Sequence, residues 1–405
     1  MAKIRPFRAL RPDPALASRI ASVPYDVVSA EEARAMAAGN PLSFLHVSRS
    51  EIDLPADTNP YADIVYRTAA ERFASIRPHM IEEPEPALYF YKLRMGAHEQ
   101  TGLAACYSVD EYDTGLVKKH EKTRRDKEDD RTRHITELRA QTGPVFLTYH
   151  ASAAVDAVAA KVAKTAPLYD LVAPDGITHT IWKVTGDDLQ AVVAAFAALP
   201  ALYIADGHHR AASAARVRKT LAPAVGRDGV VEADWFLAVA FPDNQTQVLP
   251  YNRTVKDLAG LTPEAFLAAV RQVFAVREGG PSSPARQGDC AMYLGGMWHT
   301  LEIGAKAGAD VISRLDVSIL QDHLLDPVLG IKDVRTDKRI DFVGGIRGTA
   351  ELEKLVDGGT AAVAFSMFPV SVADLMGIAD AGEIMPPKST WFEPKLRDAL
   401  LIHTI

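Results

Sequence analysis

One junction in the sequence constrains the fold more than any other. The apolar run 201–205 stops at Asp206, and a glycine, two histidines and an arginine lead into the alanine-rich stretch 211–220. A short apolar run that ends near a glycine favours a buried strand, and a run of alanine and basic residues favours a helix. Segments of strand and helix character alternate through residues 145–220. We therefore expect a mixed α/β protein.

The bulk composition limits the class of protein. The chain has 405 residues, of which 48% are apolar, so it can build about two or three domains with sizeable cores. The formal net charge of −7 argues against a dedicated nucleic-acid-binding protein. No apolar run reaches the ~20 residues that span a bilayer, and the N-terminal stretch MAKIRPFRALRPDP lacks the apolar core of a signal peptide. We expect a cytoplasmic protein without a nucleic-acid or membrane partner.

The cysteine content excludes two kinds of scaffold. Cys106 and Cys290 are the only cysteines. They cannot form a disulfide framework or a four-cysteine zinc site. Cys106 lies in an apolar, strand-like run, so we expect a buried thiol rather than a redox or metal-binding group.

Three regions differ in their pattern of elements and charge. Residues 1–114 are predicted to form an N-terminal α/β region. Residues 115–255 open with a highly charged stretch and are predicted to form an α/β core. Residues 256–405 are predicted to form a C-terminal α/β region. In the first region, Ser29 is expected to cap a helix with Glu32 as its capping-box partner.

Two local patterns predict further strands. The stretch 42–55 is interpreted as a strand followed by a loop. The segments 234–242 and 246–255 are interpreted as the two arms of a hairpin around Asp243 and Asn244.

A metal site is one interpretation of the junction at 206–210. His208 and His209 are adjacent, so they point to opposite faces of a strand or diverge by ~100° on a helix. Two ligands of one zinc ion usually lie four residues apart on a helix or on neighbouring strands. A zinc site built on this histidine pair is therefore disfavoured.

A phosphate site is the interpretation that we favour. Gly207 permits close approach of the backbone, and the free N–H groups of a helix N-terminus bind anions. Arg210 offers a planar fork for phosphate oxygens. Asp206 alone repels phosphate, but a carboxylate and phosphate oxygens together are the usual ligands of Mg²⁺. The alternative is that Asp206 only caps the helix and that the histidines pack.

The stretch 118–133 alternates lysine and arginine with acidic residues. Most of it is expected to be a solvated helix with ion pairs between successive turns. Glu121, between a possible strand and the charged helix, is the exception, because a carboxylate at such an end can act as a general base. Lys119, Lys122 and Arg124 are weaker candidates for contacts with a substrate carboxylate or phosphate.

Two motifs nearer the C-terminus allow two interpretations each. Asn252 and Arg253 follow a predicted strand, and they either close over a nucleotide or form a structural turn. The segment 385–395, MPPKSTWFEPK, is either the wall of a site or a docking segment whose aromatic residues enter a core. For this segment we favour docking.

The strand, the run Asp-Gly-His-His-Arg and the alanine-rich helix together resemble the signature of the ParB/sulfiredoxin-like superfamily. The resemblance is strongest to the free-serine kinases of archaea. It implies a nucleotide-binding core over residues 115–255, flanked by the other two regions. Gly207 to Arg210 match the phosphate-binding element, Asp206 the acid before it, and Glu121 the glutamate of an upstream His-Glu pair. Sulfiredoxin carries a cysteine in this element, and this chain does not, so sulfiredoxin chemistry is not expected.

The flanking regions add a second resemblance and a departure. The segments PYDVVS, NPLSFLHV and MPPKSTWFEPK resemble those of a large bacterial family of proteins related to the serine kinases. The chain is much longer than the compact archaeal enzymes, which leaves the acceptor open.

The resemblance implies a small-molecule kinase that forms O-phosphoserine from free L-serine, with ATP or ADP as donor and Mg²⁺. In that scheme Glu121 is the base, Asp206 holds Mg²⁺ or orients the acceptor, and His209 stabilises charge on the transferring group. Backbone groups of Gly207 and His208 and the Arg210 side chain hold phosphates, although His208 equally well contacts substrate or packs. The alternatives are a ParB-like nucleotide-binding switch or DNA-associated protein, and a metal-dependent hydrolase.

Overall fold

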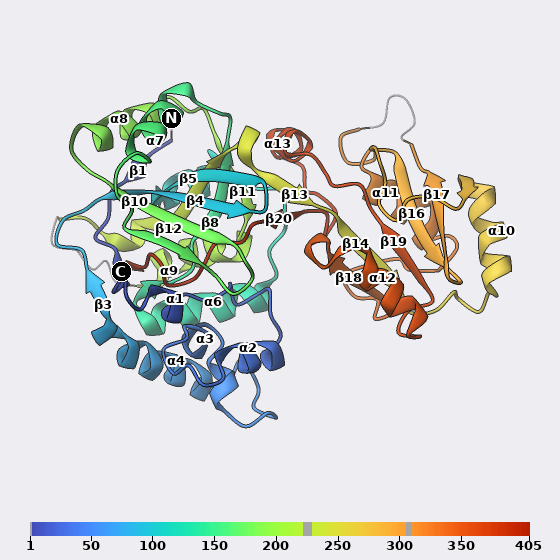
Figure 1. The fold of residues 1–405 in the computed structure, drawn as a ribbon, viewed down its shortest axis with the longest axis horizontal. Helices are drawn as coiled ribbons and strands as arrows, with labels where there is room; N and C mark the ends of the chain where they lie inside the picture. The colour runs from blue at the N-terminus through green and yellow to red at the C-terminus, as the bar shows by residue number, and fades with distance from the viewer. Residues whose placement is uncertain (1, 222–228, 305–309) are drawn as a thin grey trace. The chain divides into compact units, whose positions relative to one another are not determined.

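The computed structural model describes residues 2–221, 229–304 and 310–405. The chain forms two compact units, which are described separately. Unit 1 comprises Met1–Thr246 together with Pro394–Ile405, and unit 2 comprises Gln247–Glu393 (Figure 1). Both units combine helices with a β-sheet, so the predicted mixed α/β class is confirmed.

Unit 1 is built on a nine-stranded mixed sheet. The sheet contains β1 (Ile4–Arg5), β4 (Leu88–Met95), β5 (His98–Ser108), β6 (Val117–Lys118), β8 (Val145–Tyr149), β9 (Tyr169–Val172), β10 (Thr178–Val184), β11 (Leu202–Asp206) and β12 (Trp235–Pro242). The strands follow the order β6-β11-β8-β12-β5-β4-β10-β9, and β1 pairs with β5. Two of the pairings are parallel, β11 with β6 and β12 with β8.

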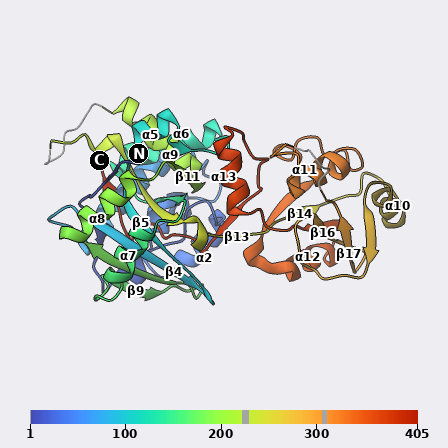
Figure 2. The ribbon, with the colours of Figure 1, turned by 90° about the horizontal axis from the view of Figure 1, so that it is seen from above.

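Helices pack against this sheet through small and apolar side chains. The helices are α7 (Ala153–Val162), α8 (Gly186–Ala197) and α9 (His208–Thr220). Phe196 of α8 and Ala211 and Ala214 of α9 belong to the same buried cluster as Leu103 and Leu147 of the sheet. The alanines of α9 leave room for close packing against α6 (Arg125–Leu138), which lies beside it in Figures 1 and 2.

A second core joins the N-terminal helices of unit 1 to the end of the chain. The helices involved are α1 (Ala17–Ile20), α3 (Leu45–Ser48) and α4 (Asp63–Ile76), while α2 (Ala30–Ala37) packs in a separate small cluster with Leu45 and Ile52. Phe44, Phe73, Ala399 and Ile402 are buried together in one cluster. The C-terminal strand β21 (His403–Thr404) pairs with β7 (Ala140–Gln141). The last residues of the chain are therefore part of unit 1.

Unit 2 contains a six-stranded antiparallel sheet. Its order is β15 (Ala275–Glu278), β17 (Met297–Glu302), β16 (Asp289–Leu294), β19 (Val363–Ser366), β14 (Tyr251–Val255) and β18 (Ile340–Gly344). Leu352 of α12 (Gly348–Asp357) packs with Tyr293, Val343 and Ala364 of the sheet. The unit also holds α10 (Pro263–Val273), α11 (Asp316–Leu320) and α13 (Val372–Asp380), labelled in Figure 2.

The three predicted regions are grouped differently in the structure. Residue 114 lies inside unit 1, because β4 and β5 pair with β10 and β12 across the predicted boundary. The predicted boundary at 255 lies close to the observed division at Gln247. The third predicted region is split, since its last residues return to unit 1.

Four local predictions have clear outcomes. The capping box is confirmed, because Ser29 Oγ accepts from the Glu32 N–H and Glu32 Oε2 accepts from the Ser29 N–H at 2.8 Å. Cys106 is buried and free, as predicted. The strand predicted within 42–55 is wrong, because helix α3 forms there. The short apolar run is compatible with either element, and Phe44, Leu45 and Val47 are buried in the helical form.

The predicted hairpin around Asp243 is also wrong. Strand β12 pairs with β5 and β8, whereas β13 (Gln247–Leu249) pairs with β20 (Trp391–Glu393). The apparent turn is the point at which the chain leaves unit 1.

Among the described residues, no helix is long and apolar enough to span a bilayer.

Candidate functional site

The candidate site lies where strands β6 and β11 end. These strands pair in parallel, with Leu202 opposite Val117 and Tyr203 opposite Lys118. Because parallel strands share a direction, the segments that leave their carboxyl ends emerge at the same edge of the sheet. Helix α6 begins after one segment and α9 after the other. Two helix N-termini, each with unpaired backbone N–H groups, therefore lie close together.

Glu121 comes close to the 206–210 junction at this edge. Its Oε2 atom lies 3.8 Å from Nδ1 of His208, and its side chain is 45% exposed. The backbone N–H of His120 donates to His208 Nε2 at 3.5 Å. An acceptor role for Nε2 leaves the proton of a neutral imidazole on Nδ1, the atom that faces Glu121. The carboxylate is thus open to solvent on one side and faces a ring N–H on the other.

The two buried histidines of the site are uncharged at neutral pH. His208 opens α9, and its ring meets the ring of His120 edge-on at a centroid distance of 4.4 Å. Burial lowers the pKa of His208 well below its usual range, and the nearby His120 and His209 lower it further. Burial also lowers the pKa of His120 to about 4. The pair therefore supplies hydrogen-bonding groups rather than positive charge.

His209 connects the starts of the two helices. Its Nε2 atom accepts a hydrogen bond of 3.0 Å from the backbone N–H of Arg124, the N-cap residue of α6. This bond satisfies one of the unpaired donors of that helix end. Burial is the main cause that lowers the pKa of His209, so this ring is also expected to be neutral.

Gly207 and Arg210 are fixed to each other by sterics. Gly207 has φ of +90°, and a Cβ atom there would lie 3.2 Å from Nε and Cζ of Arg210. Only glycine fits this left-handed backbone without displacing the guanidinium. Arg210 itself is buried and donates to the Pro144 carbonyl and, at 3.2 Å, to Asp206 Oδ2. The guanidinium group of Arg210 is thus already hydrogen-bonded to Pro144 and Asp206.

Two residues that the sequence reasoning missed join this cluster. Asp26 Oδ2 lies 3.6 Å from the same Arg210 nitrogen that contacts Asp206, and Lys395 Nζ lies 3.7 Å from Asp206 Oδ2. Burial opposes the charge on Arg210, but Asp26 and Asp206 outweigh it and raise its pKa. The carboxylates of Asp206 and Asp26 are 33% and 39% exposed. The only available signals were the Pro-Tyr-Asp turn and the lysine after Pro394, and neither indicates its partner.

The three predicted substrate contacts from the charged stretch have other neighbours. Lys119 Nζ lies 3.6 Å from the ring centroid of Tyr112. The Arg124 side chain pairs with Asp126 at 2.7 Å. Lys122 is exposed. The structure brings the backbone of Arg124 to the site, but it directs the side chains of Lys119 and Arg124 to these neighbours.

Asn252 and Arg253 lie on β14 of unit 2, where both are buried. Asn252 Oδ1 accepts from the Met367 N–H at 3.0 Å. Arg253 donates to the carbonyls of Tyr251 and Lys388 at 2.7 and 3.4 Å. Within unit 2 these contacts are those of a packed strand and support the structural interpretation.

The segment 385–395 contributes to both units. Trp391 and Phe392 form part of β20, Phe392 is buried, and the Trp391 ring meets the Tyr251 ring at 5.1 Å. These contacts favour the docking interpretation for the aromatic pair. Lys395, three residues further on, instead reaches Asp206 in unit 1.

Comparisons with solved structures find only weak similarity, whereas a comparison with family sequence profiles identifies the family. Solved structures similar to this chain include a free serine kinase in complex with AMP, at 14% identity, with 73% of this chain and 92% of the other covered and a TM-score of 0.35. A variant of free serine kinase in complex with ADP is 14% identical, the match covers 73% of this chain and 92% of the other, and the TM-score is 0.36. SbnI with a C-terminal truncation, from Staphylococcus aureus, is 11% identical, the match covers 73% of this chain and 87% of the other, and the TM-score is 0.37. At such TM-scores the likeness assigns no function to this chain.

No curated protein is detectably similar in sequence. Residues 4–318 match the sequence profile of a family described as a protein of unknown function, DUF1015. Because this match covers most of the chain, the protein belongs to the DUF1015 family.

Proposed function

We propose that this protein is a small-molecule phosphotransferase in which Glu121 activates a hydroxyl group of the acceptor. The observation that carries the proposal is the parallel pairing of β6 and β11, which brings Glu121 to 3.8 Å from His208 at the start of α9. The proposed acceptor is free L-serine, and the proposed donor is ATP or ADP with Mg²⁺. The resemblance of the Asp-Gly-His-His-Arg junction to the free-serine kinases supports this choice.

Glu121 has the surroundings of a general base. Its carboxylate is half exposed, so an acceptor hydroxyl can reach it. The neutral His208 ring presents Nδ1 at 3.8 Å from the carboxylate without adding a positive charge. A base within hydrogen-bonding reach of the proton it removes typically contributes 10²–10⁴-fold to the rate.

The helix N-termini supply the binding site for phosphate groups. Backbone N–H groups at the start of α9 and α6 carry partial positive charge and are adjacent in space. Gly207 and His208 begin the first of these turns. Arg210 is buried and holds Asp206, so its role in the proposal is to position that carboxylate and to supply positive charge from within.

The residues present fit the proposed Mg²⁺. The described part of the chain contains no group of three or more His, Cys, Asp or Glu side chains suited to a metal ion. Protein-bound Mg²⁺ usually takes only one or two carboxylates in addition to substrate phosphates and water. Asp206 and Asp26, partly exposed and bound to one Arg210 nitrogen, match that need. The metal would neutralise charge on the phosphate groups.

The remaining assignments stay predictions. His209 is the proposed stabiliser of charge on the transferring group. Lys119, Lys122 and Arg124 are the weaker proposed substrate contacts.

A transfer assay tests the proposal. The purified protein is incubated with Mg·ATP or Mg·ADP and a panel of free amino acids, and phosphorylated products are detected by ³¹P NMR. We expect O-phosphoserine from the wild-type protein and a loss of about 10²–10⁴-fold in Glu121→Gln, with nucleotide affinity retained. Asp206→Asn is expected to lose transfer as well. Glu71→Gln, an exposed change on α4, is the matched control and should leave the rate unchanged.

Two outcomes would overturn the proposal. Nucleotide binding without transfer to any small hydroxyl compound would favour the nucleotide-binding switch. Stoichiometric zinc in the purified protein, together with hydrolytic activity, would favour the metal-dependent hydrolase.

A further inference from the structure

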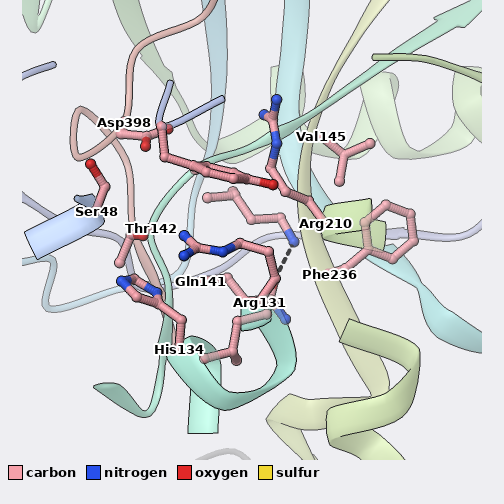
Figure 3. A pocket seen from close by; sticks show the side chains of 13 residues that line it. Ser48, Arg131, His134, Gln141, Thr142, Val145, Arg210, Phe236 and Asp398 are labelled. Atoms are coloured by element: carbon pink, nitrogen blue, oxygen red, sulfur yellow. Dashed lines mark hydrogen bonds between the residues drawn. The ribbon is translucent and has the colours of Figure 1, made fainter. Parts of the chain in front are cut away.

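A small cavity lies in unit 1 next to Arg210 (Figure 3). Its volume of about 30 Å³ provides room for about two water molecules, so a nucleotide does not fit there. Apolar groups form most of its wall, but several charged and hydrogen-bonding side chains line it as well. These polar lining residues are Tyr25, Ser48, Arg131, His134, Gln141, Thr142, Arg210 and Asp398.

The carboxyl group of Asp398 is held at this cavity by its backbone. The Asp398 N–H donates to the Ser22 carbonyl at 3.0 Å, and the next N–H, of Ala399, donates to the Thr142 carbonyl at 2.9 Å. A Cβ atom on Gly143 would collide with Asp398 Oδ1, so the carboxyl packs directly against that glycine. Asp398 is only 3% exposed. Within the described residues its carboxyl makes no hydrogen bond or ion pair.

The charges around the cavity balance without Asp398. Four cations near the cavity form ion pairs: Arg210 with Asp206 and Asp26, Lys395 with Asp206, Arg131 with Asp130, and Arg397 with Asp175. Four cations thus face four carboxylates. Asp398 is a fifth acid in the same neighbourhood, and its negative charge has no counterion of its own.

Arg210 connects this cavity to the proposed anion site. Its outer nitrogens contact Asp206, Asp26 and the Pro144 carbonyl, whereas its buried Nε atom has no hydrogen-bond acceptor in the described structure. Both Arg210 and Asp398 line the cavity, as Figure 3 shows. One or two waters there would connect the unpaired Nε–H donor to the unpaired carboxyl, as buried waters usually do.

We propose that Asp398 is a positioning residue for the anion site: its protonation state, transmitted across the cavity to Arg210, sets how strongly the site binds phosphate groups. When Asp398 is neutral, Arg210 interacts with the carboxylates of Asp206 and Asp26 alone. An ionised Asp398 adds a negative charge behind the site and competes for the guanidinium. This inference rests on the anion site of the proposed function.

Asp398 is the cavity group whose charge changes near neutral pH. Burial raises its pKa to about 7; Arg210, Arg131 and Arg397 oppose that rise, and Asp26 adds to it. His134 is neutral because burial lowers its pKa to about 3. Burial likewise raises the pKa of Tyr25, so the phenol stays protonated. Nearby, Asp206 and Lys395 are paired with each other, and burial keeps His209 neutral.

The first test is the affinity for Mg·ADP and for pyrophosphate between pH 6 and pH 8, measured by calorimetry. Ligand ionisation affects every variant equally, so the comparison of wild type with Asp398→Asn isolates the residue. From pH 6 to pH 8 the wild-type affinity is expected to fall about fivefold further than that of Asp398→Asn, as a unit charge at moderate distance predicts. Asp187→Asn, an exposed change at the start of α8, is the control and should behave as wild type.

The second test needs no ligand. In the folded protein the Asp398 carboxyl is protonated up to about pH 7, but in the unfolded chain only to about pH 3.9. Folding therefore favours the protonated form, and the unfolding equilibrium is expected to shift toward the unfolded state about tenfold per pH unit as pH rises from 5 to 7. Asp398→Asn should remove this component. Asp398→Ser, a smaller neutral change, serves the same purpose if the carboxamide folds poorly.

The outcomes separate this inference from the proposed function. Equal pH dependence of binding in wild type and both Asp398 variants would overturn the coupling while leaving the anion site intact. A failure of both ligands to bind at any pH would overturn the anion site and the coupling together. An unchanged pH dependence of unfolding in the variants would show that Asp398 does not bind a proton in the neutral range, and would also overturn the inference.

Discussion

At the scale of single residues, burial decides which ionisable groups carry charge. Desolvation keeps both His120 and His208 neutral. Arg210 is buried as well, yet it stays charged because Asp26 and Asp206 compensate the loss of solvent. The two histidines therefore add no positive charge, and the positive charge at the junction comes from Arg210 and Lys395.

A pH-dependent loss of stability follows from His120. Its pKa is about 4 in the folded protein, compared with about 6.5 in the unfolded chain. The unfolded chain therefore binds a proton between these values and the folded protein does not, so this stabilising component is present above pH 6.5 and is lost as pH falls toward 4. His120→Asn should reduce the slope of the unfolding free energy in this window by about 1.4 kcal/mol per pH unit. Urea denaturation at pH 6.5, 5.5 and 4.5 measures it.

The exposed change His79→Asn is the control for this measurement, because it also removes one imidazole but at the surface of unit 1. An identical slope in wild type and His120→Asn would contradict the neutral, buried state of His120.

At the scale of elements, the strand-to-helix junction was predictable, but its partner was not. The end of β11 at Asp206 and the start of α9 at His208 agree with the apolar run and the glycine in the sequence. The capping box at Ser29 was equally local. The pairing of β6 with β11 joins segments far apart in the chain, and no local pattern specifies it. The failed hairpin around Asp243 has the same cause, because strand character does not identify a strand's neighbour.

The Gly207 turn gives a prediction at this scale. Gly207→Ala is expected to cost about 1–2 kcal/mol for the left-handed backbone, and at least about 1 kcal/mol more for the contact with Arg210. Gly186→Ala is the matched control, because Gly186 also has positive φ, +60°, but an added Cβ meets nothing within 4 Å. Unfolding free energies of the two variants give the difference. Equal costs would show that Arg210 does not constrain Gly207.

At the scale of the whole molecule, the C-terminal residues belong to unit 1 although the preceding segment builds unit 2. The tail 394–405 supplies Lys395 and Asp398 to the site, Ala399 and Ile402 to a core, and β21 to a strand pair. A division of the sequence into consecutive regions cannot represent a chain whose last residues belong to the same unit as its first. The three predicted regions therefore missed it, although the mixed α/β class was correct.

A variant that ends at Glu393 tests this organisation. Loss of the strand pair and of the buried side chains of Leu396, Leu400, Leu401 and Ile402 should destabilise unit 1 by several kcal/mol. Each such large apolar side chain contributes about 1.5–3 kcal/mol when buried. Unit 2 contains all of its own strands, so its backbone amides should stay protected from hydrogen exchange. Hydrogen exchange followed by mass spectrometry resolves the two units. Equal loss of protection in both units, or none in either, would contradict the assignment of the tail to unit 1.

The central claim is that Glu121 is the base of a phosphotransferase whose nucleotide site does not depend on it. It is tested most directly by measuring binding and transfer in the same samples of wild type and Glu121→Gln, with Mg·ADP or Mg·ATP and L-serine. The account predicts equal nucleotide affinity in both proteins, and O-phosphoserine formation that falls by about 10²–10⁴-fold in the variant. Transfer by Glu121→Gln at the wild-type rate, or nucleotide binding by the wild type without any transfer, would contradict it.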